Sequence, residues 1–273
     1  MSDEMTFWDH LEALRMTLLR IGAVVVVVSI VVFAMKDTLF AVMLAPCTSD
    51  FLTYRVVGAE AFALHLMNTG LTEQFFIHVR TALCVGLLVA SPWVLLEVFR
   101  FVSPAVHAGE RGNVIRLTVF GYVMFVVGVL VSYFVIFPLT VRFLGPYQVS
   151  EQVDNMLTLQ SYIDTMLSLT LMMGVVFELP VVCALLSRMG LIDRQMMRAL
   201  RRHALVAVLV VSAIITPTGD AVTLLVVAMP VYLLYEGSIL VVRDRSRGGR
   251  RQESGVKELR HLVESTVLIR TQA

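Results

Sequence analysis

The chain has 273 residues, of which 58% are hydrophobic and 16% are charged, with a formal net charge of +1. An ordinary soluble domain has about 25% charged residues. The core of such a domain could not bury an apolar share as large as this one, so part of the surface must face lipid. Composition therefore excludes a soluble enzyme and a disordered chain, and three cysteines are too few for a disulfide scaffold.

The N-terminal segment is acidic, with Asp3, Glu4, Asp9 and Glu12 ahead of the first apolar run. A secretory signal peptide begins with basic residues, so we expect the N-terminus to be mature and the chain to be inserted by its own spans. Within residues 5–18, apolar side chains recur on one face at helical spacing. This pattern predicts an amphipathic helix on the membrane surface that leads into the first span.

Six long apolar runs follow, and a transmembrane helix needs about 20 apolar residues. We predict an all-α polytopic membrane protein with one membrane domain, residues 1–242, and a basic cytoplasmic tail, residues 243–273. Its six transmembrane helices are expected at about residues 18–35, 76–100, 115–140, 161–187, 203–217 and 221–242. The last two are short and flank a turn from Thr216 to Asp220, so we expect them to thin the bilayer or to tilt little.

Lysine and arginine are unevenly distributed between the loops. Eighteen lie on the side that holds both chain ends, whereas Lys36, Arg55 and Arg142 lie on the other side and Arg80 is ambiguous. Because basic loops stay in the cytoplasm, both termini are predicted to be cytoplasmic.

Four motifs stand in order along the chain. They are His10-Leu11-Glu12-Ala13-Leu14-Arg15, the loop from Ser91 to Arg111, Phe177-Glu178-Leu179-Pro180, and Thr216-Pro217 through Asp220 followed by Pro230 and Leu234-Tyr235-Glu236. Together they resemble the TatC family, the multi-spanning subunits of the twin-arginine protein translocase. The resemblance covers roughly residues 5–242. Each motif alone is weak, but four in register are specific.

The resemblance implies the core receptor subunit of a Sec-independent translocase. Such a subunit recognises the twin-arginine signal peptides of folded proteins, which are exported across the cytoplasmic (inner) membrane using the proton-motive force. The implied partners are those peptides, TatA-like and TatB-like single-span proteins, membrane lipid, and further copies of the chain within a larger complex. No enzymatic activity and no cofactor are implied.

A guanidinium group is a permanently charged, planar fork of donors, so its natural receptor is a fixed carboxylate. By resemblance, Glu110 matches one of two acidic family positions, and the other falls at Ala13. Either Glu12 substitutes by a rotation of its helix, since one residue turns a side chain by about 100°, or Glu110 acts with less help. The predicted signal-peptide site comprises Glu110, Glu12, Arg15, Arg111, Glu97 and Phe101. For Glu97, a carboxylate that reaches headgroups or basic loops is an equal alternative.

Glu178 lies deep within an apolar run. A charged group at the centre of a membrane helix costs about 2.5–3.5 kcal/mol or more, so it needs a partner. Candidates are Gln74, Arg80, Thr118 or a polar side chain of another protein, and the resemblance implies contact with partner translocase helices. The alternative function is a proton-coupled small-solute secondary transporter that uses Glu178. Such transporters commonly contain internal repeats, and this sequence shows none.

The remaining features predict structure rather than chemistry. Pro46, Pro104, Pro217 and Asp220 are expected at turns, and Pro46 resembles a family proline in the first outward loop. The cysteines and histidines lack ligand spacing, so no metal site is predicted. The arginines from Arg243 to Arg251 are interpreted as an anchor beside anionic lipid, and no nucleic-acid partner is predicted. An intramembrane enzyme is disfavoured because no nucleophile and base pair can be named.

Overall fold

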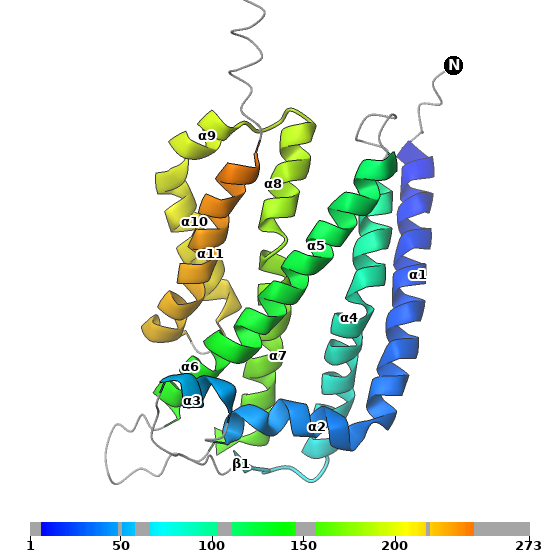
Figure 1. Ribbon diagram of the computed structural model, residues 1–273. Helices are drawn as coiled ribbons and strands as arrows, with labels where there is room; N and C mark the ends of the chain where they lie inside the picture. Colours follow the sequence, from blue (N-terminus) through cyan, green and yellow to red (C-terminus); the bar gives the residue numbers. More distant parts are fainter. Residues whose placement is uncertain are drawn as a thin grey trace, which may run out of the picture.

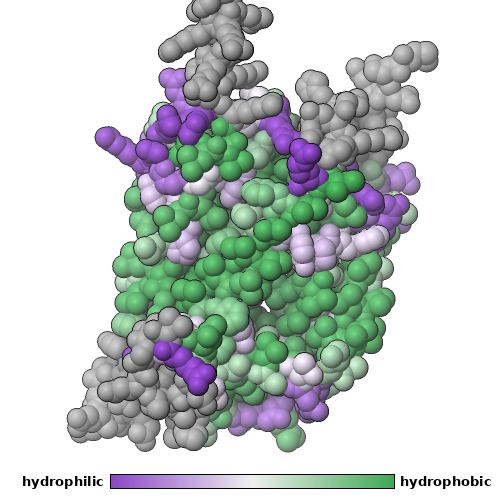
Figure 2. All heavy atoms as spheres, viewed as in Figure 1, coloured by the Kyte–Doolittle hydropathy of each residue, from purple (hydrophilic) through white to green (hydrophobic). Residues whose placement is uncertain are grey.

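The computed structural model describes residues 7–48, 51–57, 66–102, 111–145, 157–216 and 219–242. Within these ranges, five helical segments are long and apolar enough to cross a membrane. They are Leu11–Ala34, Glu73–Phe101, Ile115–Leu144, Leu159–Arg188 and Ala221–Val241. The predicted all-α, multi-pass membrane architecture is therefore confirmed. Hydrophobic side chains form a broad band across the middle of the molecule, with hydrophilic ones at its two ends (Figure 2).

The first long helix, α1 (Phe7–Ala34), packs along α4 (Glu73–Val102) (Figure 1). A Cβ atom at Gly86 would lie 2.1 Å from the Ser29 hydroxyl, so glycine lets the two backbones approach closely. From Phe7 onward, the segment predicted to be amphipathic continues into the first span as one helix, α1. No proline interrupts residues 11–34, and nothing else there would end a helix.

One end of the bundle carries short helices that lie across the spans, and we call it the α2 end (Figure 1). It comprises α2 (Lys36–Leu44), the 3₁₀ turn η1 (Ala45–Cys47) and α3 (Leu52–Val57). The strands β1 (Leu66–Met67) and β2 (Leu157–Thr158) form a parallel pair there. We call the opposite end, which holds the start of α1 and the end of α11, the N-terminal end.

Two of the long spans are broken by proline. In the third, α5 (Arg111–Val131) continues through a π-helical segment, η3 (Ser132–Ile136), into α6 (Phe137–Leu144). Pro138 has no N–H to donate to the carbonyl four residues back, at Phe134, and the Thr53 hydroxyl of α3 donates to that carbonyl instead. In the fourth span, Pro180 begins α8 (Leu179–Arg188) directly after a break that separates it from α7 (Leu159–Val176).

The last helices are α9 (Arg194–Ala199), α10 (Arg201–Ile215) and α11 (Ala221–Val241). At 1.5 Å per residue, the 15 residues of α10 reach about 22 Å, short of the roughly 30 Å hydrocarbon core. The 21 residues of α11 reach about 31 Å. The expectation of two short helices is thus wrong for α11, and the count of six spans stays a prediction. Asp220 caps α11, since its Oδ1 accepts a hydrogen bond of 2.7 Å from the Thr223 N–H.

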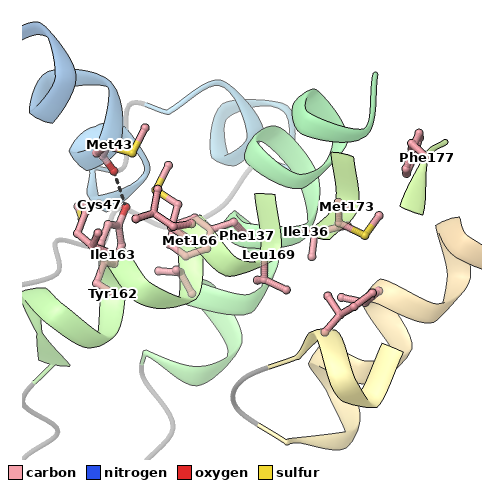
Figure 3. Packing of buried hydrophobic residues seen from close by; sticks show 14 of the residues in the cluster. Met43, Cys47, Ile136, Phe137, Tyr162, Ile163, Met166, Leu169, Met173 and Phe177 are labelled. Atoms are coloured by element: carbon pink, nitrogen blue, oxygen red, sulfur yellow. Dashed lines mark hydrogen bonds between the residues drawn. The ribbon is translucent and has the colours of Figure 1, made fainter. Parts of the chain in front are cut away.

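The main core lies toward the α2 end. Side chains from η3, α6 and α7 fill it, among them Ile136, Phe137, Ile163, Met166 and Leu169, each at most 1% exposed (Figure 3). The Tyr162 hydroxyl donates to the Met43 carbonyl at 3.1 Å and so joins α7 to α2. By contrast, only 6% of the apolar part of α1 is buried in the bundle.

Candidate functional site

Glu12 and Arg15 lie in the first turns of α1, at the N-terminal end, and both side chains are exposed. No ion pair joins Glu12 to another side chain in the described ranges. Ala13, one residue further along, is half-buried. The carboxylate at position 12 is therefore accessible to a ligand from outside the bundle.

Glu97 has a different environment. It lies near the end of α4 and is only 3% exposed. Its Oε2 is 3.7 Å from Arg20 Nη1 on α1, and its Oε1 is 3.3 Å from Arg100 Nη1 on α4. A buried carboxylate needs such compensation, and the two guanidinium groups supply it while staying largely exposed. Glu97 therefore already has two basic partners, one on α1 and one on α4, and neither lies in a connecting loop.

Two other residues of the predicted signal-peptide site, Phe101 and Arg111, stand at the helix ends that flank the connection between α4 and α5. Phe101 is half-buried in the last turn of α4, and Arg111 is the first residue of α5. Glu110 and Pro104 lie outside the described residues, as does Pro217. The ends of α1, α4 and α5 are neighbours in the bundle (Figure 1). The connection thus joins helices next to the exposed Glu12.

Glu178 lies at the break between α7 and α8, where Pro180 prevents a continuous helix. Both carboxylate oxygens are buried, and no residue in the described ranges donates a hydrogen bond to them. A Cβ atom at Gly121 of α5 would lie 3.0 Å from Glu178 Oε2 and 3.0 Å from a ring carbon of Phe99, so the glycine leaves the carboxylate its space. Arg80, one of the candidate partners of Glu178, instead pairs with Asp164 at the α2 end.

Two structural turns are placed directly. Pro46 lies in η1, where the chain leaves α2, and its carbonyl accepts a hydrogen bond of 3.1 Å from the Tyr54 hydroxyl. Asp220 occupies the cap described above. Sequence reasoning missed the ion pair between Arg80 and Asp164. A signal was present, since the two opposite charges stand a similar distance inside the second and fourth apolar runs.

Comparison with known proteins identifies the family. Residues 9–230 match the family profile of the Sec-independent protein translocase protein, TatC. The chain belongs to the TatC family. A TatC from Carboxydothermus hydrogenoformans is 30% identical over 239 residues, which cover 88% of this chain and 93% of that protein. TatCy from Bacillus subtilis is 26% identical over 257 residues, which cover 94% and 96%.

The TatC fold is shared as well. A crystal structure of the twin-arginine translocase receptor TatC superimposes with a TM-score of 0.71 at 30% identity, over 85% of this chain and 97% of that one. A second, obtained in the detergent DDM, gives 0.73 at 28% identity. The protein is thus a multi-pass membrane component of the Sec-independent translocase. The alternative of a solute transporter is not supported.

Proposed function

We propose that this chain is the subunit that captures twin-arginine signal peptides of folded cargo at the cytoplasmic face of the inner membrane. The observation that carries the proposal is the exposed Glu12, which has no ion-pair partner in the described part of the chain. It lies beside the ends of α4 and α5, and the segment between those two helices contains Glu110. Two carboxylates there would give each guanidinium of an arginine pair its own planar acceptor. The uneven distribution of basic residues assigns this end to the cytoplasm.

Glu97 has a supporting role in this proposal. Its pairing with Arg20 joins α1 to α4 and so holds Glu12 close to the start of the connection, while Arg100 on α4 itself shares the same carboxylate. Arg15 and Arg111 stand at the same helix ends, and the Phe101 ring there would pack on apolar residues next to the arginine pair.

Glu178 is proposed to contact a partner translocase helix. Its two oxygens are buried without a donor from the described part of the chain, and an unpaired acid at that depth is costly. A polar side chain on a TatA-like or TatB-like single-span protein, or on a second copy of this chain, would relieve that cost. Assembly of these partners would complete the translocase, and the proton-motive force would drive export of the cargo.

The test is binding of a synthetic twin-arginine signal peptide to the full chain in nanodiscs. Glu12→Gln and Glu110→Gln keep the side-chain size but remove the charge, and each should weaken binding by about tenfold, the equivalent of one charge-assisted hydrogen bond. Asp37→Asn is the matched control, because Asp37 is an exposed acid in the first turn of α2, at the opposite end.

A peptide with both arginines changed to lysine should bind the unmodified chain as weakly as the twin-arginine peptide binds the variants, since lysine lacks the planar fork. The proposal is wrong if both carboxylate variants, expressed normally, bind the twin-arginine peptide as tightly as the unmodified chain does. It is also wrong if the lysine peptide binds equally well.

A further inference from the structure

A charged cavity opens at the α2 end, away from the proposed peptide site. It has a volume of about 530 Å³, within the range of small-ligand sites. Its walls come from the turn before α4, the first two turns of α4 and the start of α7. Its polar side chains are those of Thr69, Thr72, Glu73, Arg80, Gln160 and Asp164. Among the charged residues that line it, two are acidic and one is basic.

The charged groups keep unused bonding capacity toward the cavity. The Arg80 Nη1 atom donates to Asp164 Oδ1 at 2.5 Å, and the two side chains remain 52% and 30% exposed. Arg80 has further N–H donors, and Asp164 has a second oxygen. Glu73 Oε2 accepts hydrogen bonds from the Thr69 N–H at 3.1 Å and from the Gly70 N–H at 2.8 Å, which stabilise the turn before α4. Glu73 Oε1 takes no part in these bonds.

The cavity lies at the depth of the bilayer where lipid headgroups are found. The apolar spans of α4 and α7 begin at Glu73 and Leu159, so the cavity lies at the depth where hydrocarbon gives way to headgroups. Phe76, which lines it, is 65% exposed, and its neighbour Phe75 is 60% exposed. Aromatic rings are enriched at that interface, and here they provide a path for an acyl chain down the side of α4.

We propose that this cavity binds the headgroup of a zwitterionic, primary-amine phospholipid, phosphatidylethanolamine, in the leaflet at the α2 end. The phosphate lies against Arg80, which is suited to phosphate by its fork of donors. The ammonium group donates to Asp164 and to the spare oxygen of Glu73. The excess acidic charge disfavours an anionic headgroup such as phosphatidylglycerol, and the trimethylammonium of phosphatidylcholine has no N–H to donate.

The test is lipid retention by the full chain purified from nanodiscs of phosphatidylcholine with a minor share of phosphatidylethanolamine or of phosphatidylglycerol. Native mass spectrometry measures the lipid that stays bound, and thermal unfolding in the same discs measures stability. We expect selective retention of phosphatidylethanolamine and a higher melting temperature in its presence. Asp164→Asn should lower retention by about tenfold, as loss of a charge-assisted hydrogen bond predicts, and should abolish the lipid-dependent rise.

Two further variants separate binding from folding. Gln160→Leu changes the wall without touching the ion pair and should also reduce retention. Glu236→Gln is the matched control, because Glu236 pairs with Arg201 at 2.7 Å with similar exposure at the other end of the bundle, and retention should be unchanged. The proposal is overturned if phosphatidylglycerol or phosphatidylcholine is retained equally. It is also overturned if Asp164→Asn lowers stability alike in every lipid while retention persists, or if soluble phosphoethanolamine stabilises the chain as well as the lipid does.

Discussion

The two ends of the bundle are built on different principles. At the α2 end, the hydroxyl groups of Tyr54, Tyr133 and Tyr162 donate to carbonyls of η1 and α2 and so join these short elements to α3, η3 and α7. Figure 3 shows the bond from Tyr162 to Met43. At the N-terminal end, the first turns of α1 are exposed, and the ion pair between Arg20 and Glu97 joins α1 to α4. One end is a fixed scaffold, and the other leaves charged groups accessible to partners.

The largest loss of stability should come from truncating a side chain in the buried core at the α2 end. Phe137 is fully buried at the centre of the core. Phe137→Ala should therefore cost about 3–5 kcal/mol, the usual range for phenylalanine deletion in a packed interior. Thermal unfolding in detergent would measure it. Phe75→Ala, which removes an exposed ring at the same end, is the control and should change stability little; equal losses in the two variants would contradict the comparison.

The scaffold should also weaken at high pH. Burial raises the pKa of Tyr54 from 10.0 to about 12. The folded state therefore holds this proton more tightly than the unfolded state, so the stabilisation is complete below about pH 10 and is lost as the pH rises toward 12. Tyr54→Phe should lower stability by about 1 kcal/mol at neutral pH, from lost hydrogen bonds, and flatten the decline above pH 10. An unchanged alkaline decline in this variant would rule Tyr54 out as its source.

Removing the charge of Glu97 at the N-terminal end should lower stability less than truncating Phe137 in the core. Glu97→Gln removes the charge that Arg20 and Arg100 share, but both guanidinium groups are largely exposed and can be solvated. We expect a loss of about 1 kcal/mol, measured by thermal unfolding. Glu97→Leu keeps the bulk without polar atoms and separates packing from charge. A loss as large as that of Phe137→Ala would mean that both ends are equally rigid.

The mildest test compares the rates at which two cysteines, one at each end of the bundle, react with a thiol reagent. Cys47 is buried at the α2 end, and burial raises the pKa of its thiol, so little thiolate exists at neutral pH. It should react slowly with maleimide in the folded protein, whereas a cysteine at position 12, introduced by Glu12→Cys, should react quickly. Comparable rates at the two positions would contradict the assignment of a closed and an open end.

The fold class followed from the sequence because long apolar runs permit few structures in lipid. The proline-driven breaks were only partly foreseeable. Pro138 and Pro180 are visible in the sequence, but that Thr53 donates to the carbonyl of Phe134 depends on how α3 folds back over the span. For the site, the distribution of basic residues and the motifs predicted that Glu12 lies near a cytoplasmic end and belongs to the peptide site. They could not show that Glu97 has two arginine partners, because pairing between α1 and α4 depends on their register.

The pairing of Arg20 with Glu97 bears on how the chain is made. Arg20 stands inside the first apolar helix, and its carboxylate partner lies near the end of the next long helix. While the ribosome is still translating the intervening segment, this guanidinium can find relief only by extending toward water or phosphate at the bilayer surface. Once α4 is complete, Glu97 becomes available as a partner for Arg20, and this pairing favours docking of α1 against α4 over its exposure to lipid. Insertion of α4 therefore sets the time at which α1 takes its final position.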